Sequence, residues 1–511
     1  MKYITYYITS LVNKIGFYNS RVFAMSIMLY IFQVIRGIGS FDPQNYKIYN
    51  VKDEIYKIDN DSKKYYWISI ENTREEFDQS KTPYLKFWPN FSKGRNYPDI
   101  DYTIDKLFRC NVSERRLHKN KTNIFLVWFA NYFIFSFLHT TYDDDLLPYN
   151  KNYFLGKPMY GASLEEEKIL RSFKNGFVKM HSDNTPLRLS DLTENQKSHV
   201  FIENPNNQDA FISGNDRANI SVGHYITQTI LLRNHNKLCK QIMEINNSLT
   251  DEQIYQLAKT INLYQFIKIV LGPYISTIGN TTDIKSDYYS TSEFTYTSIN
   301  ATWEYNLVYQ WHNMLPEKIG NVKLTELAYK PELFYKKNIG EWINLAVKTP
   351  IYEQRLNNSL PFLLPVEKQA ILASRQSNLS SYCEYRTKLK LSVPKTFMEL
   401  TGGDHRMSQN LKDVYGKVEN VEFYTGILAE PIESPGIFGE TIMKILTMIA
   451  LNALPVILHD YRRYITETDN NLLQLVDKFK YNKDYFLDNL TENEKQQLPL
   501  NFDVNNIFNL L

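Results

Sequence analysis

The sequence has few cysteines, glycines and prolines, and its charges nearly cancel. The three cysteines, Cys110, Cys239 and Cys383, exclude a disulfide framework and a Cys-x-x-Cys metal site. Lys plus Arg total 58 and Asp plus Glu total 56, which argues against nucleic acid or a strongly anionic surface as the main partner. Gly and Pro number 19 each, and no repeat or low-complexity linker is visible in the sequence. The 511 residues suffice for one large globular domain or two to four ordinary ones.

Long apolar runs are scarce as well. The N-terminal run at residues 22–35, between Arg21 and Arg36, is shorter than the about 20 residues that a helix needs to span a bilayer. The apolar run of a signal peptide normally begins nearer the start of the chain. We therefore expect residues 1–75 to form a hydrophobic segment that lies on a membrane surface or packs on the main domain, residues 76–511. A signal, an anchor and a core segment all remain open, and with them a peripheral membrane protein or a soluble intracellular one.

Helical periodicity dominates the chain from residue 123 nearly to its end. Residues 124–138 are apolar almost throughout, which predicts a buried helix. Thr250 and Gln253 have the spacing of a capping box at the start of another helix. Strand-like alternation is short and rare, so the pattern predicts a mainly α fold.

The most informative stretch is residues 304–316, Glu-Tyr-Asn-Leu-Val-Tyr-Gln-Trp-His-Asn-Met-Leu-Pro. We expect a helix here that Pro316 stops, because proline cannot donate the next backbone hydrogen bond. Tyr309 and His312 would then share one helix face. A neutral imidazole can bind a haem iron, and a neighbouring phenol can be oxidised by that iron. A histidine among aromatic residues is also common in ordinary cores, so spacing alone leaves both interpretations open.

This stretch resembles the proximal-helix signature of the cyclooxygenase-like haem peroxidases, members of the animal haem peroxidase superfamily, in which Tyr-x-Trp-His carries a radical tyrosine and the axial histidine. The resemblance runs from about Thr82 to about residue 460. It implies a mainly α, multi-helical haem peroxidase fold with few short strands and a haem b cofactor. By this likeness His312 is the axial ligand of the haem iron, and Tyr309 is the catalytic residue that forms the radical.

The distal side of the family's haem is matched in part. Residues 214–219 (Gly-Asn-Asp-Arg-Ala-Asn) and 231–236 (Leu-Leu-Arg-Asn-His-Asn) resemble the segment that carries the distal arginine. The match implies that Arg217 is this catalytic arginine, which would stabilise charge on bound peroxide. His235 falls on a structural histidine of the family, so we do not expect it to be a ligand.

The other distal segment departs from the family. Residues 128–140 resemble the helix that carries a glutamine and the distal histidine, but Asn131 replaces the glutamine and Phe135 takes the place of the histidine. His139 matches no catalytic position. Phenylalanine cannot transfer a proton, and loss of a positioned acid–base group typically costs roughly 10²- to 10⁴-fold. We expect weakened peroxidase activity, with Asn131 still offering a hydrogen bond. Whether another residue supplies the base stays open, and His224 is a candidate.

The proximal side departs as well. Arg375 and residues 381–386 resemble a proximal segment of the family, but Cys383 stands where several members have the asparagine that holds the axial imidazole. Such a partner fixes the tautomer of the ligand and raises its basicity. Residues 421–426 resemble a segment whose tyrosine reaches toward this side, so Tyr424 is a candidate substitute, acting through water. The resemblance thus implies that Arg375, Cys383 and Tyr424 lie at the cofactor.

Two further segments resemble the walls of the family's fatty-acid channel. Residues 267–275 match the channel helix, with Tyr274 near the radical site and Ile275 beside it. Residues 437–441 match the motif before the far wall, on which Leu446 and Ala450 would lie. An apolar lining is compatible with a lipid substrate and equally with an ordinary core.

Taken together, the resemblance implies a haem-dependent peroxidase or fatty-acid dioxygenase that uses a tyrosyl radical, with a polyunsaturated fatty acid and O2 or peroxide as substrates. The alternative is a catalytically degenerate member that keeps the fold as a binding or sensing module. The missing distal histidine and the altered proximal partner favour that alternative. The sequence leaves the substrate, the regiochemistry, the reductant and the oligomeric state open.

Overall fold

The computed structural model describes residues 96–137, 140–142, 148–150, 156–200, 202, 204–215, 217–279, 303–432 and 436–511. The predictions for residues 1–75, and the position of His139, lie outside the described residues. Within the described part of the chain, no helix combines the length and apolar character needed to cross a membrane.

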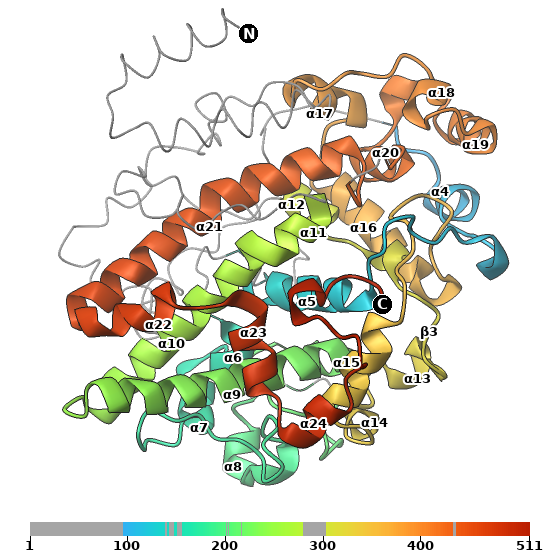
Figure 1. Cartoon of the computed structure of the whole chain (residues 1–511). Coiled ribbons are helices and arrows are strands. Elements are labelled where there is room, and N and C mark those ends of the chain that lie inside the picture. The colour runs from blue at the N-terminus through green and yellow to red at the C-terminus, as the bar shows by residue number, and fades with distance from the viewer. Residues whose placement is uncertain are drawn as a thin grey trace, which may run out of the picture.

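The fold is mainly α, as the sequence predicts (Figure 1). The longer helices are α4 (Ile100–Leu107), α5 (Ile124–Phe137), α7 (Leu164–Leu170), α9 (Val222–Ile245), α10 (Asp251–Ile269), α15 (Ile339–Val347), α16 (Leu364–Gln376), α17 (Tyr382–Lys388), α19 (His405–Tyr415), α20 (Phe423–Ala429) and α21 (Glu440–Thr468). The shorter ones are α6 (Lys157–Tyr160), α8 (Glu194–Lys197), α11 (Ile275–Gly279), α12 (Trp303–Val308), α13 (Leu324–Leu327), α14 (Pro331–Phe334), α18 (Phe397–Leu400), α22 (Gln474–Asp477), α23 (Tyr481–Tyr485) and α24 (Glu492–Gln496).

Strands are few and short. Antiparallel pairing joins β1 (Thr140–Tyr142) to β2 (Pro148–Asn150) and β3 (Lys318–Ile319) to β4 (Val322–Lys323). These two hairpins are the only sheets among the described residues, so helix packing builds the core.

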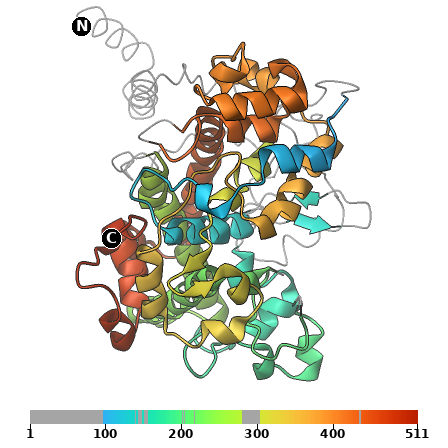
Figure 2. The same cartoon turned by 90° about the vertical axis from the view of Figure 1, so that its right-hand side faces the viewer.

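Two long helices, α9 and α10, pack along each other and form the centre of the core (Figures 1 and 2). Helix α5 packs on α9, and α21 runs alongside α10 and also contacts α12. A second group, α16, α17 and α20, packs together, and α20 reaches α12. The segment around α12 therefore lies where the two groups of helices meet.

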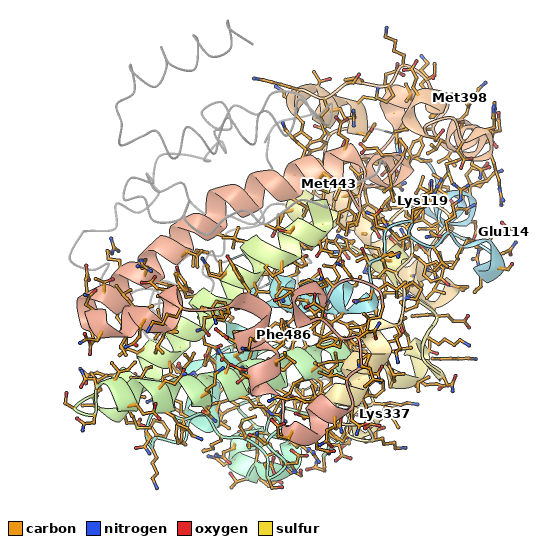
Figure 3. All side chains as sticks on the ribbon, in the orientation of Figure 1. Glu114, Lys119, Lys337, Met398, Met443 and Phe486 are labelled. Atoms are coloured by element: carbon orange, nitrogen blue, oxygen red, sulfur yellow. The ribbon has the colours of Figure 1, made fainter. Side chains whose placement is uncertain are left out.

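Helix α5 confirms the buried helix predicted for residues 124–138 as far as Phe137, where the described stretch of the chain ends. Its first turn is capped by Asn123, whose side-chain oxygen accepts a hydrogen bond from the backbone N–H of Phe125. The amide of Asn123 donates to the carbonyl oxygens of Ile507 and Asn509, which fixes the C-terminal segment to the start of α5. Phe486, labelled in Figure 3, packs edge-on against Phe125 at 5.7 Å between ring centroids.

The predicted capping box of α10 is confirmed, since Thr250 and Gln253 each accept a hydrogen bond from the other's backbone N–H. The helix then widens into a π-helical turn at Val270–Tyr274, where Gly272 has non-helical dihedrals and Pro273 lies inside the turn. Proline lacks the donor that an α-helix needs at this place, which accounts for the irregular turn. Tyr274, the last residue of the turn, is fully buried.

The helix predicted to run to Pro316 ends earlier, and this prediction was wrong. Helix α12 ends at Val308, and a 3₁₀ turn begins at His312 and ends at Met314. The indole nitrogen of Trp311 donates to the carbonyl oxygen of Val308 at 2.7 Å and so satisfies a carbonyl at the helix end. Tyr309 and His312 therefore do not share a face of one helix.

Candidate active site

His312 opens the 3₁₀ turn and keeps 20% of its side chain exposed. Its Nδ1 atom is buried and makes no hydrogen bond within the part of the chain that the structure describes. The nearest charged atom is Oε1 of Glu367, at 3.6 Å. Because Nδ1 is buried, the exposed fraction belongs to the rest of the side chain, which includes Nε2.

Glu367 lies on α16 and is fully buried. Its Oε1 atom lies 3.1 Å from the hydroxyl of Ser359, which donates to it, and its Oε2 atom accepts a hydrogen bond of 2.6 Å from the hydroxyl of Tyr424. Sequence reasoning missed this residue. Its surroundings, Leu-Pro-Val-Glu-Lys-Gln, are those of an ordinary first turn of a helix, and carry no signal of a site.

Tyr424, on α20, is fully buried and stacks on Phe108. Burial, and then the charge of Glu367, raise the pKa of the Tyr424 phenol well above its ordinary value, so the hydroxyl remains a donor. The predicted partner of His312 is thus linked to it through the Glu367 carboxylate. Cys383, on α17, directs its sulfur at the carbonyl oxygen of Val418 at 3.6 Å.

Arg375, at the other end of α16, forms a bidentate ion pair with Glu422 at 2.7 and 3.0 Å. Glu422 also accepts a hydrogen bond from the hydroxyl of Tyr415 at 2.8 Å. The guanidinium lies over the ring of Tyr97. These contacts describe a structural ion pair, and the role of Arg375 at a cofactor stays a prediction.

Tyr309 is half-buried in a cluster of aromatic rings. It stacks on Trp311 at 5.0 Å between ring centroids and meets Tyr305 edge-on at 4.9 Å. Burial raises the pKa of Tyr309 to about 12, while the hydroxyl groups of Tyr305 and Tyr274 act to lower it. The phenol is therefore protonated at neutral pH, and oxidation of Tyr309 to a neutral radical must remove a proton together with an electron.

Asn131 and Phe135 lie one helical turn apart on α5, and both are half-buried. The ring of His224, on α9, lies 5.9 Å from that of Phe135 and 4.6 Å from that of Tyr132. His224 is fully buried, and its Nε2 atom lies 3.4 Å from the hydroxyl of Ser213. Burial lowers the pKa of His224 to about 3. The structure thus brings the alternative base next to the phenylalanine, in an environment that makes it a weak base.

Arg217 is exposed on the turn before α9, and its backbone N–H donates to the side chain of Asn215. His235 is fully buried on α9, where its two ring nitrogens lie within hydrogen-bond distance of the Tyr160 hydroxyl, at 3.0 Å, and of the Gly176 carbonyl oxygen, at 2.9 Å.

The residues predicted for the channel lie on three elements, the π-helical turn, α11 and α21. Tyr274 is in contact with the rings of Phe129 and Phe133, and Ile275 begins α11 directly after it. Leu446 is buried on α21, and Ala450 lies one turn further along this helix. Figure 1 shows α21 running beside α10 and α11. Their role as a channel stays a prediction.

The donor set around His312 suits haem better than a bare metal ion. No group of three or more His, Cys, Asp or Glu side chains that could hold an ion occurs among the described residues. A haem needs only one protein ligand on its proximal side. Metal-binding histidines usually direct their second nitrogen at a carboxylate or carbonyl, and the buried Nδ1 of His312 faces Glu367 in this way.

Comparison with known proteins agrees with this geometry. The family model "Animal haem peroxidase" matches residues 151–453, more than half of the chain. Prostaglandin G/H synthase 2 of Bos taurus is 26% identical over 343 residues, which cover 65% of this chain and 56% of that protein. Its counterpart in Gallus gallus is 28% identical over 345 residues, covering 65% and 57%. The chain thus spans little more than half the length of these relatives.

Solved structures share the fold. Peroxidase A from Dictyostelium discoideum has a TM-score of 0.62 at 16% identity, covering 83% of this chain and 95% of that one. A variant of fatty acid alpha-dioxygenase from Oryza sativa, solved with palmitic acid, has a TM-score of 0.59 at 15% identity, covering 74% and 79%. The predicted family and fold are confirmed: this chain belongs to the animal haem peroxidase family.

Proposed function

We propose that this chain holds haem b through Nε2 of His312 and acts as a haem-dependent oxidoreductase of the peroxidase or fatty-acid dioxygenase type. The observation that carries the proposal is the geometry of His312, whose buried Nδ1 faces a carboxylate 3.6 Å away while 20% of the side chain stays exposed. Membership of the animal haem peroxidase family supports the cofactor. The names of the relatives, prostaglandin synthases and a fatty acid alpha-dioxygenase, support a fatty acid and O2 as substrates.

Tyr309 is the residue that we propose to carry the radical. A haem held by His312 would supply the one-electron oxidising equivalent once a peroxide has oxidised it. Tyr309 loses that electron and its hydroxyl proton, and the phenoxyl oxygen then takes a hydrogen atom from a carbon of the fatty acid, which restores the phenol. Molecular oxygen adds to the carbon radical that remains. The resulting peroxyl radical takes a hydrogen atom back from the Tyr309 phenol, which yields a hydroperoxide and regenerates the tyrosyl radical. Tyr305 and Tyr274 surround the Tyr309 hydroxyl and limit its contact with water, which favours hydrogen transfer from a substrate over loss of the radical to solvent.

We further propose that peroxide turnover is slow. Phe135 stands where proton transfer would need a base, and the neighbouring His224 has a pKa of about 3, so it accepts a proton poorly at neutral pH. Arg217 would supply positive charge and Asn131 a hydrogen bond, but neither group accepts a proton. Slow peroxide turnover is compatible with dioxygenation, because the tyrosyl radical needs to be generated only occasionally.

The phenylalanine at position 135, next to a histidine with a lowered pKa, also favours a second candidate function. A family member without a competent distal base would bind haem and serve as a binding or sensing module. The two candidates differ in whether O2 is consumed, which makes them separable by one set of measurements.

The test begins with the absorption spectrum of the full chain reconstituted with haem b, followed by O2 uptake with linoleate, arachidonate and palmitate. We expect a Soret band that His312→Ala abolishes and the control His405→Ala, an exposed histidine at the start of α19, leaves intact. We expect Tyr309→Phe to keep the Soret band and lose O2 uptake. Haem binding without O2 uptake in the unmodified protein would favour the binding module, and an unchanged Soret band in His312→Ala would refute the proposed ligand.

A further inference from the structure

The carboxylate beside His312 is unusual in its surroundings. Glu367 is fully buried, and the only basic side chain within ion-pair distance of it among the described residues is that of His312. A buried carboxylate is costly unless hydrogen-bond donors satisfy its oxygens. The Tyr424 hydroxyl donates to one oxygen, and the Ser359 hydroxyl lies within hydrogen-bond distance of the other, where its single proton is shared with the side-chain oxygen of Asn313.

One acceptor position on Oε1 remains, and it faces His312. Nδ1 of this imidazole is buried and has no hydrogen-bond partner within the described residues. The separation of 3.6 Å is slightly longer than a hydrogen bond. Hydrogen bonds at catalytic groups are often long before the site is loaded and shorten afterwards. A small rotation of the imidazole would bring the two atoms into hydrogen-bond range.

The backbone next to the imidazole is held in place independently. The guanidinium of Arg115 donates to the carbonyl oxygens of Asn313 and Leu315, at 2.9 and 2.8 Å. The side chain of Asn313 meets the hydroxyl of Ser359, which also contacts Glu367. The turn that carries His312 and the carboxylate that faces it are thus joined through one serine.

We propose that Glu367 is the positioning residue of the axial ligand: its carboxylate accepts the Nδ1–H of His312, selects the tautomer with a free Nε2, and gives the imidazole partial anionic character. The inference rests on the proposed role of His312 as the iron ligand. It assigns to a carboxylate on α16 the role that the resemblance had pointed to at Cys383 and Tyr424. Tyr424 then acts on the carboxylate by donating to its other oxygen.

A carboxylate acceptor has a consequence that a neutral acceptor lacks. Negative charge on the ligand stabilises ferric over ferrous iron, so the midpoint potential of a bound haem is lowered. Glu367→Gln keeps the shape and an acceptor oxygen but removes the charge. We therefore expect Glu367→Gln to shift the equilibrium between ferric and ferrous haem at least tenfold toward the ferrous form. For a one-electron couple this corresponds to a rise in midpoint potential of at least about 59 mV.

The experiment measures the midpoint potential by spectroelectrochemistry and the iron–histidine stretching frequency of the ferrous protein by resonance Raman spectroscopy. We expect Glu367→Gln to raise the potential, to lower the frequency, and to weaken haem affinity roughly 10- to 100-fold. Glu367→Asp keeps the charge at greater distance, so its shifts should have the same sign and be smaller. If Glu367→Gln does not fold, Glu367→Asp alone decides: an unchanged potential in it would refute the inference.

The matched control is Glu304→Gln. Glu304 is an equally buried carboxylate that accepts a tyrosine hydroxyl, that of Tyr385, but does not lie within ion-pair distance of His312. Its substitution should leave the potential and the stretching frequency unchanged. Equal shifts in Glu304→Gln and Glu367→Gln would show a general effect of buried charge and overturn the inference. A His312→Ala protein with an unchanged haem spectrum would refute the ligand itself, an outcome distinct from failure at Glu367.

Discussion

Replacing Phe135 by histidine is the most direct test of why peroxide turnover should be slow. Phe135 lies on α5, one turn after Asn131, and is half-buried, so an imidazole at this position would keep contact with solvent. Its pKa should then lie near the ordinary value of about 6.5, whereas burial lowers the pKa of the adjacent His224 to about 3. Phe135→His would thus place a competent base at a position where the chain has phenylalanine.

The expected gain follows from the usual worth of a positioned acid–base group, roughly 10² to 10⁴ in rate, or about 3 to 5 kcal/mol of barrier. The substitution also removes part of a hydrophobic contact, at a cost of about 1 to 2 kcal/mol of folding free energy for a half-buried ring. The gain in rate constant should therefore exceed any decrease in activity that comes from a smaller folded fraction of the protein. The assay is guaiacol oxidation by hydrogen peroxide, with kcat/KM measured on haem-loaded protein.

Two comparisons decide whether the new imidazole is responsible. Ile134→His places a histidine at the neighbouring half-buried position of α5 and should not raise kcat/KM. Combining Phe135→His with His224→Phe should preserve the gain, because His224 is not the acting base. A Phe135→His protein that binds haem normally and stays within threefold of the unmodified kcat/KM would refute the assignment of this position.

Further predictions concern stability. Burial raises the pKa of Glu166 to about 7, above an ordinary value of 4.5, so the folded state holds a proton that the unfolded state releases. Stability should fall as pH rises from about 4.5 to about 7, and Glu166→Gln should recover about 1 to 3 kcal/mol at pH 8 and nothing at pH 4, measured by urea unfolding. Arg233 and Glu494 form a buried bidentate pair at 2.7 and 3.1 Å that joins α9 to α24. Arg233→Met should cost about 3 to 5 kcal/mol in thermal or urea unfolding, and adding Glu494→Leu should restore much of it, whereas additive losses would contradict the pairing argument.

Sequence reasoning succeeded where the determining interactions are local. The apolar composition of residues 124–138 is enough to bury α5, and the capping box at Thr250 depends on residues three apart. The end of α12 shows the limit of such rules. Pro316 sets the latest residue at which the helix can end. Helix α12 ends earlier, at Val308, whose carbonyl oxygen accepts a hydrogen bond from the indole N–H of Trp311.

The candidate site follows the same division. His312 and Tyr309 belong to a contiguous, specific motif, so they could be proposed from sequence. Glu367 could not, because its contact with His312 joins residues far apart in the chain and depends on how α16 packs under the 3₁₀ turn. The proximity of His224 to Phe135 likewise depends on the packing of α9 against α5, which no local pattern encodes.

The two positions at which we propose that this chain departs from the family, Phe135 and the carboxylate beside His312, would act on the same bond. Peroxide cleavage is assisted from the distal side by proton transfer and from the proximal side by electron donation through the ligand. A carboxylate acceptor at Glu367 would strengthen electron donation through His312, whereas phenylalanine at position 135 weakens proton transfer. Glu367 and residue 135 should therefore be energetically coupled. A double-mutant cycle measures this coupling directly. We expect Glu367→Gln to lower peroxidase kcat/KM by a larger factor in the unmodified protein than in Phe135→His, because a restored base makes the reaction depend less on the ligand's charge. Equal factors in the two backgrounds would mean that the sites act independently, and that Glu367 holds His312 in place without compensating for the missing base.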